Sequence, residues 1–162
     1  MSSSTPDRKA SSGFSIVHEP IDLAALRTRF EDQRCGAAVF FEGRVRDHND
    51  GRAVDRLEYE VYEPLALSEG ARIIEEARVR WSIFGAVGVH RGGLLELGDI
   101  AIVVGVVSPH RDEAFLAARY IIDEAKQRLP IWKLEHYRDG DRRWVNCHRC
   151  AHARSSGAES RA

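Results

Sequence analysis

Lysine is rare in this chain, and two of its lysines stand where amine chemistry could occur. Of the 24 basic residues, 21 are arginines and three are lysines, at positions 9, 126 and 133. An amine can lose its proton when it is buried or crowded by other cations, whereas a guanidinium stays charged. If Lys126 and Lys133 lie close together, one of them could act as a general base or a nucleophile. A structural role for Lys126, as a cation that stabilises a helix C-terminus, stays open.

A second candidate is the run Ser108-Pro109-His110-Arg111. Ser108 suits a helix N-cap and Pro109 suits the first helical position, so the spacing predicts a helix that begins here. Free N–H groups at a helix N-terminus favour anions, Arg111 offers a planar fork for phosphate or carboxylate, and His110 can exchange a proton near neutral pH. The alternative is that both side chains point into solvent or pair with an acid such as Asp112.

Two smaller clusters contain arginine or histidine. Arg44, Arg46 and His48 lie where a strand runs into the turn-rich segment 46–52, which is expected to be a mobile loop. These side chains could clamp an anion, although solvated loop charge is by itself the better explanation. His90 ends a predicted strand just before two glycines, and we expect it to be structural rather than catalytic.

The C-terminal segment contains Cys147-His-Arg-Cys150 followed by His152. These are zinc-ligand types, but a structural zinc site usually needs a second ligand pair, and Cys35 is far away in the sequence. No metal site is therefore predicted, and Cys147 and Cys150 remain the candidates if a metal binds. Cys35 lacks a strongly positive neighbourhood and is expected to be a small buried residue.

The elements that must position these residues are read from hydrophobic periodicity and turn signals. Strands are predicted over 14–18, 36–45, 54–62, 87–90, 94–97, 100–107, 131–137 and 142–145. Helices are predicted over 21–31, 64–81 and 108–129. Together they indicate an α+β domain with a mostly antiparallel sheet and two long helices.

The last helix and the strand after it are expected to be neighbours, because only Pro130 separates them. This connection could bring the amines of Lys126 and Lys133 together. On the strand, Trp132 and Leu134 share one face, while Lys133 and Glu135 share the other. The apolar stripe of the helix is expected to consist of Ala114, Phe115, Ala118, Ile121, Ile122, Ala125 and Leu129.

Composition excludes several classes of protein. With 162 residues the chain suits one domain, expected over 14–145, between polar tails at 1–13 and 146–162. A net charge of −1 gives no pull toward nucleic acid or anionic membranes, and no apolar run is long enough to span a bilayer. The N-terminus lacks the apolar region of a secretory signal, and three cysteines favour a reducing cytoplasm. Nucleotide-hydrolase and redox-cofactor motifs are missing from the sequence.

Three long segments of the chain are similar to one known family. They are GAAVFFEGRVRDHNDGRAVDRLEYEVYEPLA, VVGVVSPHRDEAFLAARYIIDEAKQRLPIWKLE and DGDRRW, with VHRGG between the first two. In order and spacing, residues 35–145 resemble the large, catalytic subunit of molybdopterin synthase. The segments SPHRDEAF and PIWK carry the most specific part of this resemblance.

The resemblance implies a fold, a reaction and partners. The family fold is an α/β hammerhead with additional antiparallel strands. The family enzyme converts cyclic pyranopterin monophosphate (precursor Z) to molybdopterin by sulfur transfer, in molybdenum cofactor biosynthesis. The sulfur comes from the C-terminal thiocarboxylate of a small ubiquitin-like subunit, and two large subunits form the homodimer core of a heterotetramer. No cofactor, nucleic acid or membrane is implied.

By position, Lys126 and Lys133 match the two active-site lysines of the family, and Arg46, His110 and Arg111 match its substrate pocket. We assign acid/base chemistry to Lys126 and substrate positioning with charge stabilisation to Lys133, although the reverse split is open. A non-catalytic dimer that only docks a ubiquitin-like tail is the alternative from another functional class.

Overall fold

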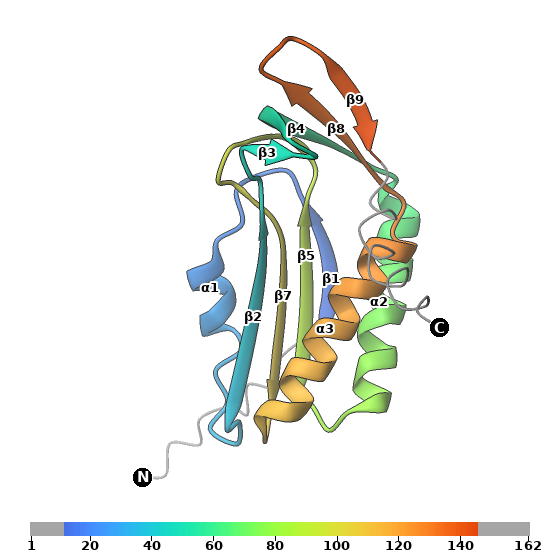
Figure 1. Ribbon diagram of the computed structural model, residues 1–162. Helices are drawn as coiled ribbons and strands as arrows, with labels where there is room; N and C mark the ends of the chain where they lie inside the picture. The colour runs from blue at the N-terminus through green and yellow to red at the C-terminus, as the bar shows by residue number, and fades with distance from the viewer. Residues whose placement is uncertain (1–11, 146–162) are drawn as a thin grey trace, which may run out of the picture.

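Nine strands form two sheets in the computed structural model, which describes residues 12–145 (Figure 1). The first sheet has the order β1 (Gly13–Val17), β5 (Gly85–Arg91), β7 (Ile100–Ser108) and β2 (Ala37–Arg44). The second has the order β3 (His48–Asn49), β4 (Arg52–Val61), β8 (Ile131–Tyr137) and β9 (Arg142–Val145), and β6 (Gly93–Glu96) also pairs with β4. Only β1 and β5 pair in parallel within this part of the chain, so the predicted α+β class with mostly antiparallel pairing is confirmed.

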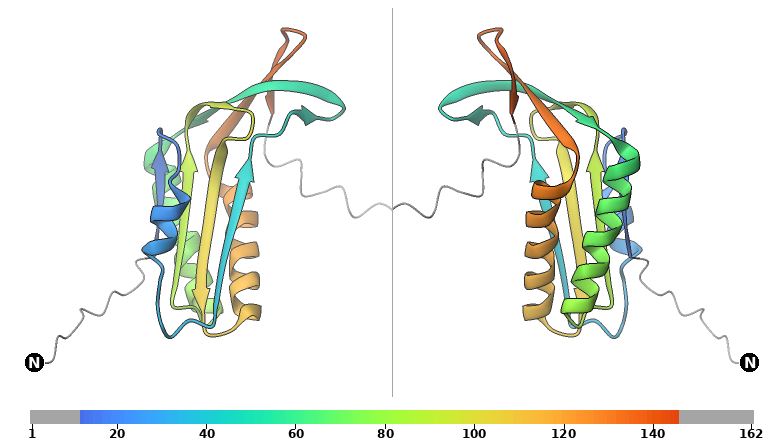
Figure 2. Two further views of the ribbon diagram at one scale, coloured as in Figure 1. Left: turned by 90° about the vertical axis from the view of Figure 1, so that its left-hand side faces the viewer. Right: turned by 90° about the vertical axis from the view of Figure 1, so that its right-hand side faces the viewer.

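Three helices cover the first sheet within the described residues. The long helices α2 (Glu63–Arg80) and α3 (Arg111–Arg128) lie side by side on one face, and the short α1 (Leu23–Thr28) lies on the other (Figures 1 and 2). The second sheet crosses above the end of the first, where α3 leads into β8 (Figure 1). No helix among the described residues is both long and apolar enough to cross a membrane.

Strand β7 explains this layering, because it is buried on both faces. Ile102, Val104 and Val106 pack in the cluster that contains α2 and α3. Val103 and Val107 pack in the separate cluster beneath α1. A strand covered on both sides reads as a continuous apolar run rather than as an alternating pattern, as seen in IAIVVGVV.

Phe14 on β1 joins the sheet to α2 at a place where two glycines leave room for its ring. A Cβ atom on Gly70 would lie 2.3 Å from Cγ of Phe14, and a Cβ on Gly88 would lie 2.3 Å from its Cδ2. Any larger residue at either position would push the ring out. The close approach of α2 to the sheet therefore depends on both glycines.

Two predictions about α3 are wrong. The helix begins at Arg111 with His110 as the N-cap residue, not at Pro109 with Ser108 as the cap. Ser108 is the last residue of β7, and its hydroxyl donates a hydrogen bond to the carbonyl oxygen of His110. Phe115 does not belong to the buried stripe and is 61% exposed, because Ala117 occupies the buried position instead.

The segment 46–52 is not the loop that its composition predicts. His48 and Asn49 form β3, which folds back on β4 through a turn at Asp50 and Gly51 with φ values of 47° and 77°. Two consecutive positive φ values are the signature of a type I′ hairpin turn. The pairing of β4 with β8 shifts its register between Val54 and Arg56.

Other boundaries shift by a few residues. The first helix covers Leu23–Thr28 rather than 21–31, and the Asp22 side chain caps it by accepting a hydrogen bond from the Ala25 amide. Of the predicted tails, residues 1–11 and 146–162 lie outside the described residues, whereas Gly13 begins β1.

Arg128 clamps α3 to α2, and its removal gives a first testable prediction. Its guanidinium donates hydrogen bonds to Glu69, Glu76 and Glu124. Arg128, followed by the Tyr120 hydroxyl, lowers the pKa of Glu76 from 4.5 to about 2. A lowered carboxyl pKa stabilises the fold above pH 4.5, and this stabilisation is lost as the pH falls toward 2.

Arg128→Met should therefore lower the free energy of unfolding at pH 7 by about 1 kcal/mol, because the network is partly exposed to solvent. Urea unfolding of the variant and the native protein at pH 7 and near pH 2 measures the effect. The difference should shrink at the lower pH, and an equal difference at both pH values would contradict this explanation. Arg78→Met, which removes an exposed pair with Glu75, is the matched control and should change stability little.

Candidate active site

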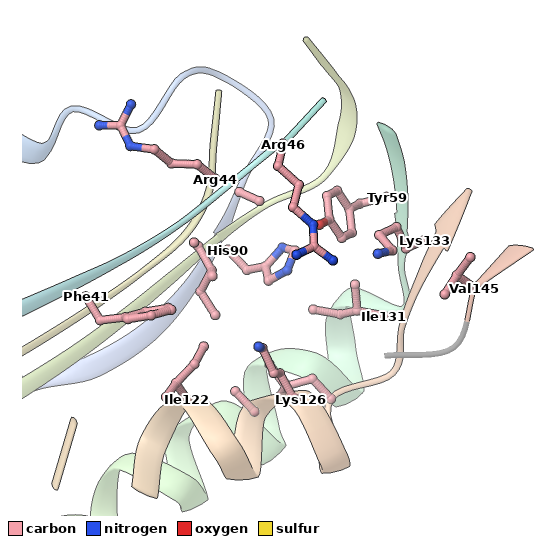
Figure 3. Close-up of a pocket in the computed structure, with 15 residues that line it drawn as sticks. Phe41, Arg44, Arg46, Tyr59, His90, Ile122, Lys126, Ile131, Lys133 and Val145 are labelled. Carbon is pink, nitrogen blue, oxygen red and sulfur yellow. The ribbon is translucent and has the colours of Figure 1, made fainter. Parts of the chain in front are cut away.

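A cavity of about 480 Å³ opens where the two sheets meet the C-terminal end of α3 (Figure 3). Its apolar wall comes from both sheets, from α3 and from the residues that follow α3. This wall includes Phe41, Ile102, Ile122, Leu129 and Ile131. Its basic lining consists of Arg44, Arg46, Lys126 and Lys133, so the cavity combines an apolar surface with positive charge.

Lys126 reaches the cavity from the last turn of α3 (Figure 3). The helix stops at Arg128, because Pro130 cannot continue it, and β8 begins at Ile131. Partial negative charge at a helix C-terminus favours a cation at this position. Lys126 has no ion-pair or hydrogen-bond partner among residues 12–145, so its amine is available to a ligand.

Lys133 lines the same cavity from β8, as the short connection predicts. Its Nζ lies 2.8 Å from Oε1 of Glu135, and only 18% of its side chain is exposed. Lys133 and Glu135 occupy the inner face of β8, whereas Trp132 on the outer face is 47% exposed. The charged face of this strand is therefore the buried one.

Glu135 is a buried carboxylate, only 1% exposed, that organises the residues around it. Besides Lys133, it accepts hydrogen bonds from Asn49 Nδ2, at 3.0 and 3.1 Å, and from the Tyr137 hydroxyl at 2.5 Å. Burial by itself would raise the pKa of Glu135, but the hydrogen bonds from Lys133, Tyr137 and Asn49 outweigh it and hold the pKa below its ordinary value. The carboxylate is thus charged at neutral pH and holds the Lys133 amine in place.

Arg46 is positioned by the β3–β4 hairpin. Its Nη2 donates a hydrogen bond to Oδ1 of Asn49 at 2.9 Å, and Asn49 in turn donates to Glu135. One asparagine therefore links the two cations Arg46 and Lys133. Arg52 ties the same hairpin to β8, because its guanidinium lies 3.7 Å from the centre of the Tyr137 ring.

The cavity carries excess positive charge. Glu42 neutralises Arg44, with Nη2 and Oε2 2.5 Å apart, and Glu135 neutralises Lys133. Arg46 and Lys126 have no carboxylate partner in the part of the chain that the structure describes. None of the described residues that line the cavity is an acid. An anionic ligand would supply the missing counter-charge.

The predicted site residues divide into two groups. Arg46, Lys126 and Lys133 line one cavity, whereas His110 and Arg111 lie at the opposite end of α3. Lys126 lies fifteen positions after Arg111 on the helix, which corresponds to about 22 Å. The Arg111 side chain is 84% exposed, and its Nε lies 4.0 Å from Oδ1 of Asp112. This matches the alternative in which the side chain points into solvent or pairs with Asp112.

The fold brings three further residues to this region: Asn49 and Tyr59, which the sequence did not single out, and His90, which was expected to be structural. Tyr59 and His90 line the cavity, with ring centres 5.0 Å apart. Tyr59 belongs to the alternating apolar residues of β4, but this pattern does not show which face of the strand meets the cavity. His48, by contrast, is exposed and pairs with Asp47 at 2.7 Å.

Comparison with known proteins places the chain in a family. The family described as MoaE protein matches residues 16–128. The chain belongs to the MoaE protein family. The match includes Arg46, His110, Arg111 and Lys126, and Lys133 lies just beyond its end.

MoaE relatives cover most of the chain. A protein from a Nostoc species named molybdopterin synthase catalytic subunit is 40% identical over 143 residues, which is 88% of this chain and 87% of the relative. A Bacillus subtilis protein of the same name is 39% identical over 132 residues, covering 82% and 83%. The crystal structure of molybdopterin synthase from Staphylococcus aureus matches with a TM-score of 0.75 and 38% identity, covering 80% of this chain and 94% of that one.

The cysteines do not form a metal centre in the described part of this MoaE chain. Within residues 12–145 no cluster of three or more histidine, cysteine or acidic side chains could hold a metal ion. Cys35 is partly buried, and burial raises the pKa of its thiol, which disfavours a reactive thiolate. The candidate zinc ligands Cys147 and Cys150 lie outside the described residues.

Proposed function

We propose that this protein is the catalytic subunit of a molybdopterin synthase. It transfers sulfur from the C-terminal thiocarboxylate of a small ubiquitin-like subunit to cyclic pyranopterin monophosphate. The observation that carries the proposal is the convergence of Lys126, Lys133 and Arg46 on one cavity in a MoaE chain. We assign the activity to the domain over residues 14–145 and place it in the cytoplasm, without a cofactor.

The cavity suits the chemistry of this substrate. Its volume of about 480 Å³ lies within the range of small-molecule sites, and its apolar wall suits a flat heteroaromatic ring. The cyclic phosphate carries negative charge, for which Arg46 supplies an uncompensated guanidinium at the rim. Phe41 and Tyr59 offer aromatic surfaces for the pterin.

The two lysines have environments that suit different roles. Sulfur transfer from a thiocarboxylate requires proton transfers, and it requires groups that stabilise the negative charge developing on an acyl oxygen. Lys126 lines the cavity and has no acidic partner in the described part of the chain, so we assign it the acid/base role. Lys133 is held by Glu135 as a fixed cation, which suits substrate positioning and stabilisation of negative charge.

We propose that His110 and Arg111 contribute to the cavity of the other subunit in the homodimer. One chain holds them about 22 Å along α3 from Lys126, farther than a single small substrate can reach. If they bind the substrate, as the resemblance implies, they must act in the cavity of a second copy. The exposure of both side chains is compatible with such a contact.

Mixed dimers test this arrangement. Arg111→Ala and Lys126→Ala homodimers should each be nearly inactive. An equal mixture of the two should recover about a quarter of native turnover, because random exchange makes half of the dimers mixed and each mixed dimer has one intact cavity of two. Recovery should follow the rate of subunit exchange. A mixture as inactive as its parents, with exchange demonstrated by mass spectrometry, would exclude a contribution of Arg111 to the cavity of the second copy. A fully active Arg111→Ala homodimer would place Arg111 outside the site.

Reconstitution tests the function itself. The purified chain, mixed with the thiocarboxylated small subunit and cyclic pyranopterin monophosphate, should form molybdopterin. The small subunit with an ordinary C-terminal carboxylate is the control and should give no product. Tight binding of the thiocarboxylated subunit without turnover would instead support a non-catalytic docking module.

A further inference from the structure

We propose that His90 is a substrate-binding residue, whose Nε2 accepts a hydrogen bond from an N–H group of the pterin ring. This inference rests on the proposed function, because it names a contact with the substrate of that reaction. It adds a neutral acceptor to a cavity whose charged residues are all cations.

His90 is buried and yet lines the cavity. It is 8% exposed, on a strand that is buried from Gly85 to His90. Figure 3 shows its imidazole within the same cavity as the amine of Lys126 and the guanidinium of Arg46. The edge-to-face contact with Tyr59, with ring centres 5.0 Å apart, restricts rotation of the imidazole.

The hydrogen bond at the other ring nitrogen determines the tautomer. Nδ1 lies 3.0 Å from the backbone oxygen of Arg91, which can only accept, so Nδ1 carries the hydrogen and donates it. In the neutral ring Nε2 then presents a lone pair. Burial lowers the pKa of His90 to about 4, which keeps the ring neutral at physiological pH. Nε2 has no hydrogen-bond partner within residues 12–145.

The hydrogen-bonding character of the cavity explains why the ligand group should be an N–H. Arg46 and Lys126 are donors when charged and suit phosphate and carbonyl oxygens. A pterin ring also carries N–H groups, and burying one without an acceptor costs binding free energy. A neutral histidine that lines the cavity and has its Nδ1 engaged elsewhere supplies that acceptor, and it selects against rings that lack the donor.

Steady-state kinetics on two variants test the contact. His90→Phe keeps a ring of similar size against Tyr59 and removes the acceptor, so the KM for cyclic pyranopterin monophosphate should rise about 10- to 100-fold. The kcat and the KM for the thiocarboxylated small subunit should stay within twofold. His90→Gln, which restores a carbonyl acceptor, should recover part of the loss. His136→Phe removes a histidine that does not line the cavity and is the matched control.

Nitrogen-15 NMR of histidine-labelled native protein tests the same contact without turnover. Addition of cyclic pyranopterin monophosphate alone should shift the Nε2 resonance of His90 in the direction of a hydrogen-bonded acceptor, while His136 stays unchanged. An unshifted Nε2 at saturating pterin would overturn the proposal. So would a His90→Phe variant in which the KM for the small subunit rises and the KM for the pterin does not.

These measurements separate the two proposals. Native protein that makes no molybdopterin contradicts the proposed function, yet the NMR titration still reports on the pterin contact. Native protein that turns over, with His90 insensitive to the pterin in both assays, contradicts only the role of His90. If His90→Phe does not fold, as circular dichroism would reveal, His90→Gln and the NMR titration of the native protein decide the question.

Discussion

Replacing Lys126 by alanine is expected to lower the kcat of molybdopterin formation by about 10²- to 10⁴-fold, the range for a group that transfers a proton in the transition state. The fold should tolerate the change, because the side chain is exposed and has no acidic partner in the described part of the chain. The free energy of unfolding should fall by no more than about 0.5 kcal/mol, through the lost interaction with the helix dipole. Single-turnover assays and urea unfolding measure the two quantities.

Two further variants identify what Lys126 contributes. Lys126→Arg keeps the charge, but a guanidinium does not exchange its proton at neutral pH. Activity should therefore stay low in this variant if Lys126 transfers protons, and native activity would show that charge alone is required. Gln127→Ala changes the next exposed residue of α3 and is the control for local effects. Native turnover in both Lys126→Ala and Lys133→Ala would refute the assignment of the two lysines.

Replacing Glu135 by leucine is expected to be the most destabilising change in the site. The substitution would leave Lys133 without its counter-charge, and Tyr137 and Asn49 without their acceptor. Breaking a buried pair of this kind typically costs 3–5 kcal/mol, and the partial exposure of Lys133 reduces the expected loss to about 2–4 kcal/mol. Urea unfolding at pH 7 measures it.

The pH dependence of this loss has a definite sign. The pKa of Glu135 is lower in the folded protein than its ordinary value of 4.5, so the stabilisation is complete above that value and is lost as the pH falls below it. The difference between native protein and Glu135→Leu should therefore narrow below pH 4.5. Glu60→Leu, at an exposed position on β4, is the control and should change stability little. An equally small effect of both substitutions at pH 7 would show that Glu135 does not hold the site together.

Loss of Glu135 should also affect catalysis. Asn49 connects Glu135 to Arg46, so the carboxylate influences both cations that we assign to substrate binding and charge stabilisation. In Glu135→Gln, which keeps the shape of the side chain, the KM for the pterin substrate should rise even where the fold is retained. An unchanged KM for the pterin in folded Glu135→Gln would show that Glu135 stabilises the fold but does not position the substrate-binding cations.

Local sequence determined most of the secondary structure and its type. The run Ile100–Val107 is apolar throughout because β7 is covered on both faces, and the run predicts a strand without knowledge of the rest of the fold. The Pro130 break and the short connection predicted that α3 and β8 would be neighbours, and Lys126 and Lys133 line one cavity. These signals are local, since they depend on backbone preference and on the period of the side chains along one element.

Tertiary structure decided which faces of those elements are buried and which residues meet. The Lys133–Glu135 face of β8 turned inward and Trp132 turned outward, because β4 and the β3–β4 hairpin supply Asn49 as a polar partner that pattern analysis cannot see. His90 became part of the cavity only because β5 ends beneath the second sheet. Sequence determines what each strand can offer, whereas partners distant in the chain determine whether a charge or a polar ring can be buried, since burial without a partner costs several kcal/mol.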